Sequence, residues 1–386
     1  MMKIFVLIFV LTGYLYADEV GILTDTREKI IQLKKKQIIE QEKINKYQWL
    51  SDIYLNASIK KDEDNLMYED YSLSFSQDIF KFGGIGSEIQ YAKELRKLEN
   101  INLDISTKED IYSVYSLLID LKINELNLKQ NILNVKNRQI DIAHKTSQYK
   151  AGEIGISDLN DAIILKNNLM VLQESIVALK QKNLLSLKQF TSKKYSEMDL
   201  PHVELLNKEL FLSQSLSLKQ ALLESSTKDL NYQIKKSEYL PSFSVEAKYG
   251  YNDNEKIQGD DYYQYGLSFS LPLSYTSSHD IEQEKLEYLM TQQSYNKKKY
   301  EIQLEYENAL VSIQNNQNKI VLAEEDIRLY KELINVNQEE YDAGYKTIDD
   351  IQSLKNSQKI REFDIKIYEL NIKKVLIFVN LSLETN

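Results

Sequence analysis

Cysteine is absent from the 386 residues, and proline and glycine are scarce, at 3 and 11 residues. The lack of cysteine excludes disulfides, thiol catalysis, cysteine-ligated metals and a lipid anchor on an N-terminal cysteine. The three histidines show no H-x-x-H or H-E-x-x-H spacing, which argues against a zinc site. Because residues that break helices and strands are so rare, we expect long uninterrupted elements.

Catalytic motifs are also missing. The sequence has no P-loop, no G-x-G-x-x-G and no catalytic constellation, so we expect neither an enzyme nor a bound cofactor. A net charge of −10 argues against nucleic acid as a partner. Tyrosine, in contrast, is abundant at 27 residues. Its amphipathic ring suits a wet interface or a membrane boundary better than a dry core.

The first 17 residues have the pattern of a secretory signal peptide. Lys3 precedes an apolar run over 4–16, and Ala17 is followed by two acidic residues. That run would form a helix of roughly 20 Å, too short for a bilayer core of about 30 Å. We predict cleavage after Ala17, with a buried N-terminal helix as the alternative. No later stretch comes near 18 apolar residues, so no transmembrane helix is expected.

An internal duplication organises the rest of the chain. Residues 149–159 read YKAGEIGISDL and residues 341–351 read YDAGYKTIDDI, with identities offset by 192 positions. Upstream, YSLSFS at 71–76 matches YGLSFS at 265–270 with an offset of 194. Two matches at nearly one offset indicate a tandem repeat. The predicted halves are residues 18–200 and 201–386.

Strict alternation of apolar and polar residues marks strands in both halves. In the second half it covers 242–251 and 263–275, with a polar loop over 252–261 between them. The first half repeats the pattern less cleanly, with apolar rows at 53–59 and 71–75. Each half therefore supplies one hairpin with an apolar face and a face of serine, glycine and charged residues. A half-buried sheet over a soluble core is the alternative.

Two stretches of 63 residues, 87–149 and 279–341, hold neither glycine nor proline. Each would form a helix of roughly 95 Å, too long for a globular domain. Apolar residues recur at heptad spacing in two rows per helix, which predicts neighbours on two sides, as in a closed ring of helices. An ordinary bundle helix is the alternative. In the first helix one row is Ile111, Val114, Leu118 and Leu121, and the other is Leu126, Leu133 and Ile140. In the second helix one row is Ile313, Ile320, Ile327 and Ile334, and the other is Leu322, Leu329 and Val336.

Glycine turns are predicted to end these long helices. Gly152 and Gly344 stand where a helix commonly stops. Ser157 and Thr347 follow, where a hydroxyl can cap a returning helix. Each half therefore includes a very long helical hairpin. The return helices are predicted over 158–190 and 349–380.

The order helix, strand, strand, long helix, Y-x-x-G turn and return helix, given twice, resembles the TolC-like outer-membrane factors. The segment YLPSF at 239–243 looks like the start of the family's third strand, and GLSFSLPL at 266–273 looks like the end of its fourth. In the first half Ser51 stands where the second half has Pro241. The similarity covers essentially the whole chain after the signal peptide.

The resemblance implies a mainly α fold with a membrane β-barrel, in which three protomers of four strands close a 12-stranded barrel above a long periplasmic α-helical tunnel. Four strands cannot close alone, and lipid cannot satisfy an open edge, so oligomerisation also follows from physics. Tyr249, Tyr251, Tyr263 and Tyr265 suit the aromatic girdle. The lipid-facing strand residues would be Phe243, Val245, Leu267 and Phe269, and the water-facing ones Ser242, Ser244, Ser268 and Ser270.

At the periplasmic tip the resemblance implies an aperture lined by acidic residues of the second hairpin. By position, Asp350 is the best candidate for this ring. A second acidic position of the family is Ser353 here, which shifts that duty to Asp349. The alternative for each aspartate is a charge that only stabilises the helix start.

A tether that holds the hairpin shut is implied at the same tip. Lys346 stands where the family often has a basic residue, and Tyr341 precedes it. Asp158, at the tip of the first half, is the candidate partner of either residue.

The function implied is the outer-membrane exit duct of a tripartite efflux or type I secretion system in a Gram-negative bacterium. Its partners would be two further copies in a homotrimer, outer-membrane lipid, a periplasmic adaptor and an inner-membrane pump. A periplasmic adaptor is an alternative, but it would not repeat its strands in this way. A soluble coiled-coil scaffold is another, and it predicts neither a signal peptide nor alternating strands rich in serine and tyrosine.

Overall fold

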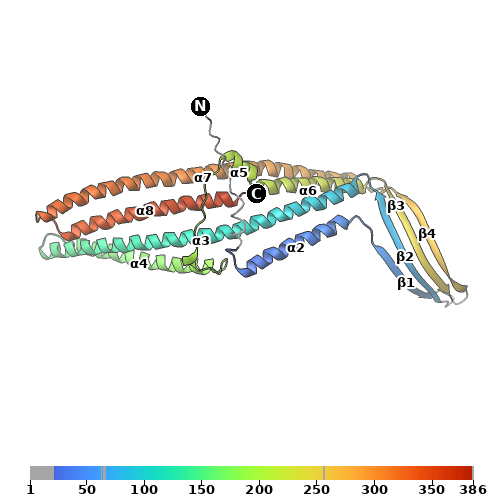
Figure 1. Cartoon of the computed structure of the whole chain (residues 1–386), viewed down its shortest axis with the longest axis horizontal. Helices are drawn as coiled ribbons and strands as arrows, with labels where there is room; N and C mark the ends of the chain where they lie inside the picture. Colours follow the sequence, from blue (N-terminus) through green and yellow to red (C-terminus); the bar gives the residue numbers. More distant parts are fainter. Residues whose placement is uncertain (1–20, 62, 64–66, 255–256, 385–386) are drawn as a thin grey trace, which may run out of the picture. The chain divides into compact units, whose positions relative to one another are not determined.

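A computed structural model describes residues 21–61, 63, 67–254 and 257–384. The predicted signal peptide lies outside these residues. The order helix, strand, strand, long helix, return helix occurs in both halves, as the sequence predicts (Figure 1). The first half holds α2 (Asp25–Tyr47), β1 (Ile53–Lys61), β2 (Met67–Phe80), α3 (Gly84–Lys150), α4 (Ile156–Leu187) and the short 3-10 helix η1 (Tyr195–Glu197). The second holds α5 (Lys208–Gln214), α6 (Leu216–Glu238), β3 (Ser242–Asn254), β4 (Ile257–Ser270), α7 (Ser277–Asp342) and α8 (Ile348–Leu381).

The chain divides into two compact units, and each draws on both halves of the sequence. Helices α3 and α7 are long enough to continue from one unit into the other. The first unit holds Met1–Lys29, Ser106–Ser215 and Ile302–Asn386, and the second holds Ile30–Ile105 and Leu216–Glu301.

The second unit contains an antiparallel sheet of four strands in the order β1-β2-β3-β4 (Figure 1). The predicted loop over 252–261 is wrong, because β3 continues to Asn254 and β4 begins at Ile257. The turn is much shorter than the run of polar residues, since an exposed strand end tolerates polar side chains. The predicted end of the last strand at residue 275 is also wrong, since β4 stops at Ser270. Pro272 lacks the N–H that would continue the ladder.

The helices of the second unit pack on a small apolar core. Leu98 and Ile101 of α3 meet Leu216 and Leu223 of α6, and all four are buried. Helix α2, by contrast, buries none of its residues within the unit.

The first unit holds the two helical hairpins. Ile111, Val114, Leu118 and Leu121, the predicted seam of α3, are fully buried. The second predicted row of α7 is instead exposed on the single chain, at Leu322, Leu329 and Val336. The first predicted row of α7 is buried at Ile313 and half-buried at Ile320, Ile327 and Ile334, so the exposed second row is the side left for a further partner.

Helix α4 overturns the expectation that no later segment is apolar enough to cross a membrane. An 18-residue window within Ile156–Leu187 has a mean hydropathy of 1.3 and only 6 % of it is buried. The expectation failed because scattered asparagines and lysines interrupt the apolar run without lowering its average greatly. Length and composition alone are weak support for a membrane span, and α4 pairs its Lys180 with Glu125 of α3 at 2.9 Å.

Glycines stand at the turns of both hairpins. Gly152 and Gly344 have φ of 74° and 81°, a backbone conformation that side chains with a Cβ disfavour. In each turn the next residue donates its N–H to a carbonyl five residues back: Glu153 to Gln148 at 2.9 Å, and Tyr345 to Glu340 at 2.8 Å. This double turn is the Schellman motif, which satisfies the last carbonyls of a helix.

Candidate functional site

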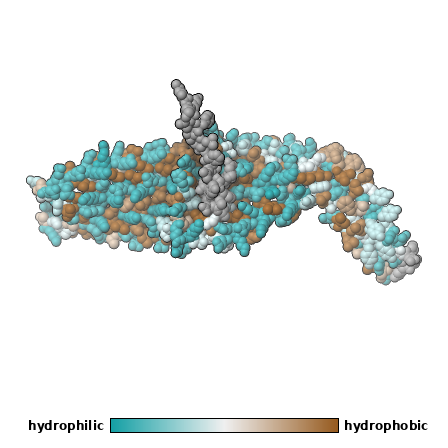
Figure 2. Space-filling view, in the orientation of Figure 1, coloured by the Kyte–Doolittle hydropathy of each residue, from teal (hydrophilic) through white to brown (hydrophobic). Residues whose placement is uncertain are grey.

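Two regions carry the residues that the sequence singles out: the faces of the sheet and the tips of the helical hairpins. On the sheet, the register places Phe243 opposite Phe269 and Val245 opposite Leu267. All four belong to one face because side chains alternate along a strand. Phe80 extends this face, with its ring centroid 6.3 Å from that of Phe243. The apolar face is largely uncovered in the single chain, as the brown surface beside the strands indicates (Figure 2).

Tyrosines occupy the loop end of the same apolar face. Tyr249 lies opposite Tyr263, and Ala247 lies opposite Tyr265. The rings of Tyr263 and Tyr265 stack with centroids 6.3 Å apart, and both side chains are exposed. The face therefore has phenylalanine toward the helices and tyrosine toward the loops, which are the residues expected along a lipid-facing wall and its interface.

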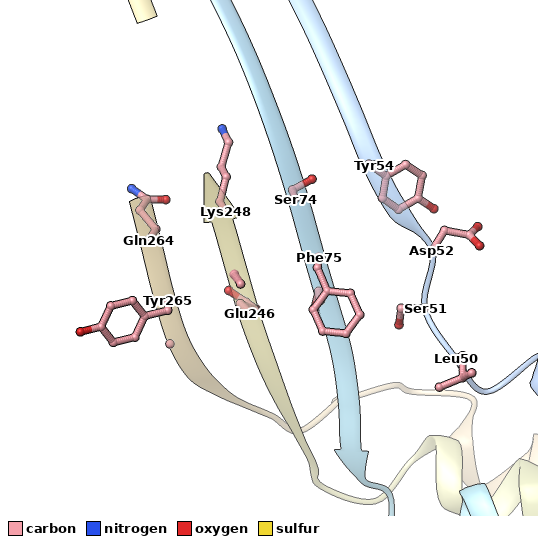
Figure 3. A pocket seen from close by; sticks show the side chains of 13 residues that line it. Leu50, Ser51, Asp52, Tyr54, Ser74, Phe75, Glu246, Lys248, Gln264 and Tyr265 are labelled. Atoms are coloured by element: carbon pink, nitrogen blue, oxygen red, sulfur yellow. The ribbon is translucent and has the colours of Figure 1, made fainter. Parts of the chain in front are cut away.

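The opposite face of the sheet is polar. One row across all four strands consists of Tyr54, Ser74, Lys248 and Gln264. These side chains line a hollow of about 630 Å³ together with Glu246 (Figure 3). Such a face fits contact with water and not with lipid.

Hydrogen bonds connect this polar face across the strands. Ser268 donates to Glu246 at 2.7 Å, and Tyr262 donates to Asp70 at 2.8 Å. The Lys248 ammonium lies 5.4 Å from the centre of the Tyr262 ring. Tyr262 also covers Gly250, where a Cβ would lie 2.5 Å from the ring. Each of these three charged side chains thus has a partner on another strand.

At the tip of the second hairpin, Asp350 caps the start of α8. Its carboxylate accepts the N–H of Thr347 at 3.0 Å and the hydroxyl at 2.8 Å, and Thr347 Oγ1 accepts the Asp350 N–H at 3.3 Å. The hydrogen bonds from Thr347 hold the pKa of Asp350 below its usual value. Asp158 is the counterpart in the first hairpin and accepts the N–H of Gly155 at 3.2 Å. The capping role offered as an alternative for these aspartates is therefore present.

The predicted cap at Ser157 is wrong. Helix α4 begins at Ile156 with Gly155 as its N-cap, so no hydroxyl of an N-cap residue accepts a helix N–H there. The repeat offset of 192 explains this, because the counterpart of Thr347 is Gly155 and not Ser157.

The predicted tether residues lie at the tips of the two helical hairpins. Lys346 is exposed, and within the described ranges no ion pair joins it to Asp158. Its charge adds to the causes that lower the pKa of Asp350. Tyr341 is exposed, and its carbonyl accepts the N–H of Gly344. Asp349 is also exposed, in the first turn of α8.

Sequence reasoning missed a ladder of polar contacts between α3 and α8. Gln130 donates to Asp364 at 2.7 Å, and Asn137 donates to Ser357 at 3.3 Å. At the tip end, His144 Nε2 lies 4.0 Å from Asp350 Oδ1. Each rung is seven residues from the next on both helices. A polar residue at every seventh position of a seam was the available signal.

A first prediction concerns the helix caps. Thr347→Ala should destabilise the start of α8 by about 1 kcal/mol, the usual cost of losing a capping hydroxyl. Hydrogen exchange of the amides in the first turn of α8 measures this. Ser157→Ala is the matched control and should change exchange in α4 little, since its hydroxyl caps nothing. Equal acceleration in both variants would contradict the assigned caps.

A second prediction concerns pH. Because the pKa of Asp350 is lowered in the fold, the stability it adds is full above the unfolded value near 3.8 and disappears as pH falls through the folded value. Exchange protection at the α8 start should therefore persist at pH 5 and decline only below about pH 4. In Asp350→Asn this acid-induced decline should be absent. Loss of protection between pH 7 and 5 in the native chain would oppose the assignment.

Comparison with known proteins agrees with this geometry. Residues 208–358 match the family described as outer membrane efflux protein. No curated protein matches the chain by sequence. Three similar solved structures are outer-membrane proteins. They are the CmeC channel of Campylobacter jejuni (TM-score 0.75, 16 % identity, 95 % of this chain and 85 % of that one), VceC of Vibrio cholerae (0.74, 16 %, 96 % and 95 %) and the open state of the MtrE channel of Neisseria gonorrhoeae (0.73, 14 %, 94 % and 87 %).

The shared fold extends over nearly the whole chain, and the family match covers the second sheet hairpin, all of α7 and the first third of α8. The family match includes β3, β4 and the tip of the second helical hairpin. Residues 208–358 are therefore similar to the outer membrane efflux proteins, and the chain shares the fold of these outer-membrane channels.

Proposed function

We propose that this protein is the outer-membrane exit duct of a tripartite export system, built as a homotrimer with a 12-stranded barrel. The observation that carries the proposal is the open sheet. Within the described residues, β1 and β4 are edge strands, while one face is apolar and exposed and the other is polar. Lipid cannot satisfy open edges, so four such strands span a membrane only when further copies close the barrel.

The two faces then have opposite surroundings. Phe243, Val245, Leu267 and Phe269 face lipid, and the row that includes Ser74 and Lys248 faces the water-filled interior. The uncovered row of α7 and the apolar surface of α4 meet neighbouring copies, which accounts for an exposure unusual in a single helix pair. The helical part lies in the periplasm and forms the tunnel.

The tips carry the aperture in this proposal. Asp350 and Asp349 ring the constriction, and Lys346 with Tyr341 contributes contacts that hold it closed against Asp158 or another group of a neighbouring copy. A periplasmic adaptor and an inner-membrane pump are the expected partners, for efflux of small molecules or for type I secretion. A periplasmic adaptor function is disfavoured because the sheet combines hairpins from both repeats.

Fractionation and reconstitution test this proposal together. The protein should be recovered with the outer membrane as a detergent-stable trimer, and purified trimers should conduct ions across a planar bilayer. A soluble periplasmic monomer without conductance would reject the duct. Heat-denatured protein, added at the same concentration, is the control for leakage caused by detergent.

A further inference from the structure

We propose that β4 of one protomer pairs with β1 of the next in the same register that joins β2 to β3 within one chain. The partner of both sheet edges is thus a second copy of this chain. The inference rests on the proposed trimeric barrel and adds the residue-by-residue register at the seam between copies. It comes from the internal duplication combined with the observed strand pairing.

The duplication assigns each strand a counterpart. Tyr71 of β2 corresponds to Tyr265 of β4, 194 positions later. For β1 and β3 the strand starts provide the match, because Trp49-Leu50 corresponds to Tyr239-Leu240, 190 positions later. Thus β4 is the counterpart of β2, and β3 is the counterpart of β1.

The observed hairpins agree with these assignments. Ile53 pairs with Phe75 in the first hairpin. The counterparts of these two residues are Phe243 and Phe269, and they pair with each other in the second hairpin. The offsets come from the sequence and the pairing comes from the structure, so their agreement shows that the two hairpins share one register.

The seam between β2 and β3 is therefore a template for the seam between copies. Ser74 pairs with Lys248 within the chain, and their counterparts are Ser268 and Ser58. Ser268 should consequently pair with Ser58 of the partner subunit. The same rule applies to three further pairs of the template seam. Phe75 pairs with Ala247, which predicts that Phe269 pairs with the partner's Ala57. Leu73 pairs with Tyr249 and Gln77 with Val245, which predicts that Leu267 pairs with the partner's Ile59 and Leu271 with the partner's Leu55.

The chemistry of the two edges supports this register. It sets apolar residues opposite apolar ones and serine opposite serine, whereas a slip of one residue would turn one strand's apolar row toward water. The side chains it brings together are among the most exposed on the sheet, with Leu55 at 80 % and Leu267 at 77 %. Leu73, on an inner strand, is exposed to 47 %.

The position of Pro272 agrees with the proposed register between copies. Its counterpart is Asp78, the last residue of β2 before the register shifts in a bulge against β3. Proline is accepted at strand edges and bulges because it donates no hydrogen bond to the ladder. The pairing between copies should therefore end near Pro272, close to the observed end of β4.

Paired cysteines test the register, and the absence of native cysteine removes any background. In Ser58→Cys/Ser268→Cys the two Cα atoms of directly opposed residues would lie about 4.5–5.5 Å apart. A disulfide accepts Cα distances of about 4.4–6.8 Å. Mild oxidation of outer membranes should therefore link most of the protein into covalent trimers, which a reductant should return to single chains on a denaturing gel.

Matched variants separate the possible outcomes. Ser74→Cys/Lys248→Cys occupies the same place in the template seam and should protect both thiols without increasing the mass. Asn56→Cys/Ser268→Cys and Lys60→Cys/Ser268→Cys are shifted by two residues, or about 6.6 Å along the strand, and should cross-link at least tenfold more slowly. Faster linkage in either shifted pair, or a stable trimer that never links through residues 58 and 268, would overturn the register. A protein that stays monomeric in the membrane would instead reject the proposed duct.

Discussion

Leu267→Arg is expected to abolish most assembly of the protein in the outer membrane. Leu267 lies on the apolar face of β4, opposite Val245, and its side chain is largely exposed on the single chain. An arginine directed at lipid costs about 2–4 kcal/mol near the bilayer midplane and about 0–1 near the interface. Three copies repeat that cost in one trimer. Trimer yield in the outer-membrane fraction, by native gel, is the measurement.

The adjacent residue provides the control for this prediction. Ser268→Arg adds the same charge on the polar face, where the serine hydroxyl already contacts Glu246 at 2.7 Å. An arginine there has water and a carboxylate as neighbours, so trimer yield should stay near that of the native protein. Phe269→Arg should be intermediate, since Phe269 lies two residues nearer the helices. Equal yields for the arginines at 267 and 268 would reject the assignment of faces.

Much of this fold could be predicted from periodicity and chain breakers. The two stretches without glycine or proline lie within α3 and α7, which extend only a few residues farther. The first predicted seam of α3 is buried, because heptad spacing reports directly on which side of a helix has a neighbour. The alternating segments form strands whose faces divide as the alternation indicates.

Other features could not be predicted from periodicity and chain breakers. The polar ends of β3 and β4 resembled a loop because polar composition is shared by turns and by strand ends in water. The cap at Gly155 was missed because a glycine N-cap leaves no side-chain signal. The contact of His144 with Asp350 joins residues 206 positions apart on α3 and α8, and no local rule brings such residues together.

Asp350 at the tip can serve both as a helix cap and as a charge of the proposed aperture. Asp350 serves as a helix cap through one carboxylate oxygen, Oδ2, while Oδ1 lies toward His144 on α3. A capping residue can also contribute charge to an aperture, since the cap needs only acceptors and the field needs only the negative charge. Changing the charge while keeping an acceptor is therefore the informative substitution.

Asp350→Asn should reduce the cation preference of the open channel while leaving its gating similar. Asparagine retains a side-chain oxygen that can accept the Thr347 N–H, and the variant removes three charges from the proposed ring. The reversal potential in a salt gradient across a planar bilayer measures the change. Asp349→Asn removes the exposed carboxylate one residue earlier in the same turn and should give the smaller shift, because Asp350 is the main candidate for the ring. A larger shift in Asp349→Asn would move the ring to that residue.

Lys346→Glu should instead open the closed tip. Within the described part of the chain Lys346 forms no ion pair with Asp158, and the proposed tether is to a neighbouring copy. A partly desolvated pair between copies would contribute on the order of 1–3 kcal/mol, compared with about 0–1 for an exposed one. Over three protomers even about 1 kcal/mol each shifts the ratio of closed to open channels by roughly a hundredfold. Single-channel recording should show larger or longer openings in Lys346→Glu. Lys355→Glu, on the exposed side of α8, should leave them unchanged, and identical openings in both variants would remove the tether.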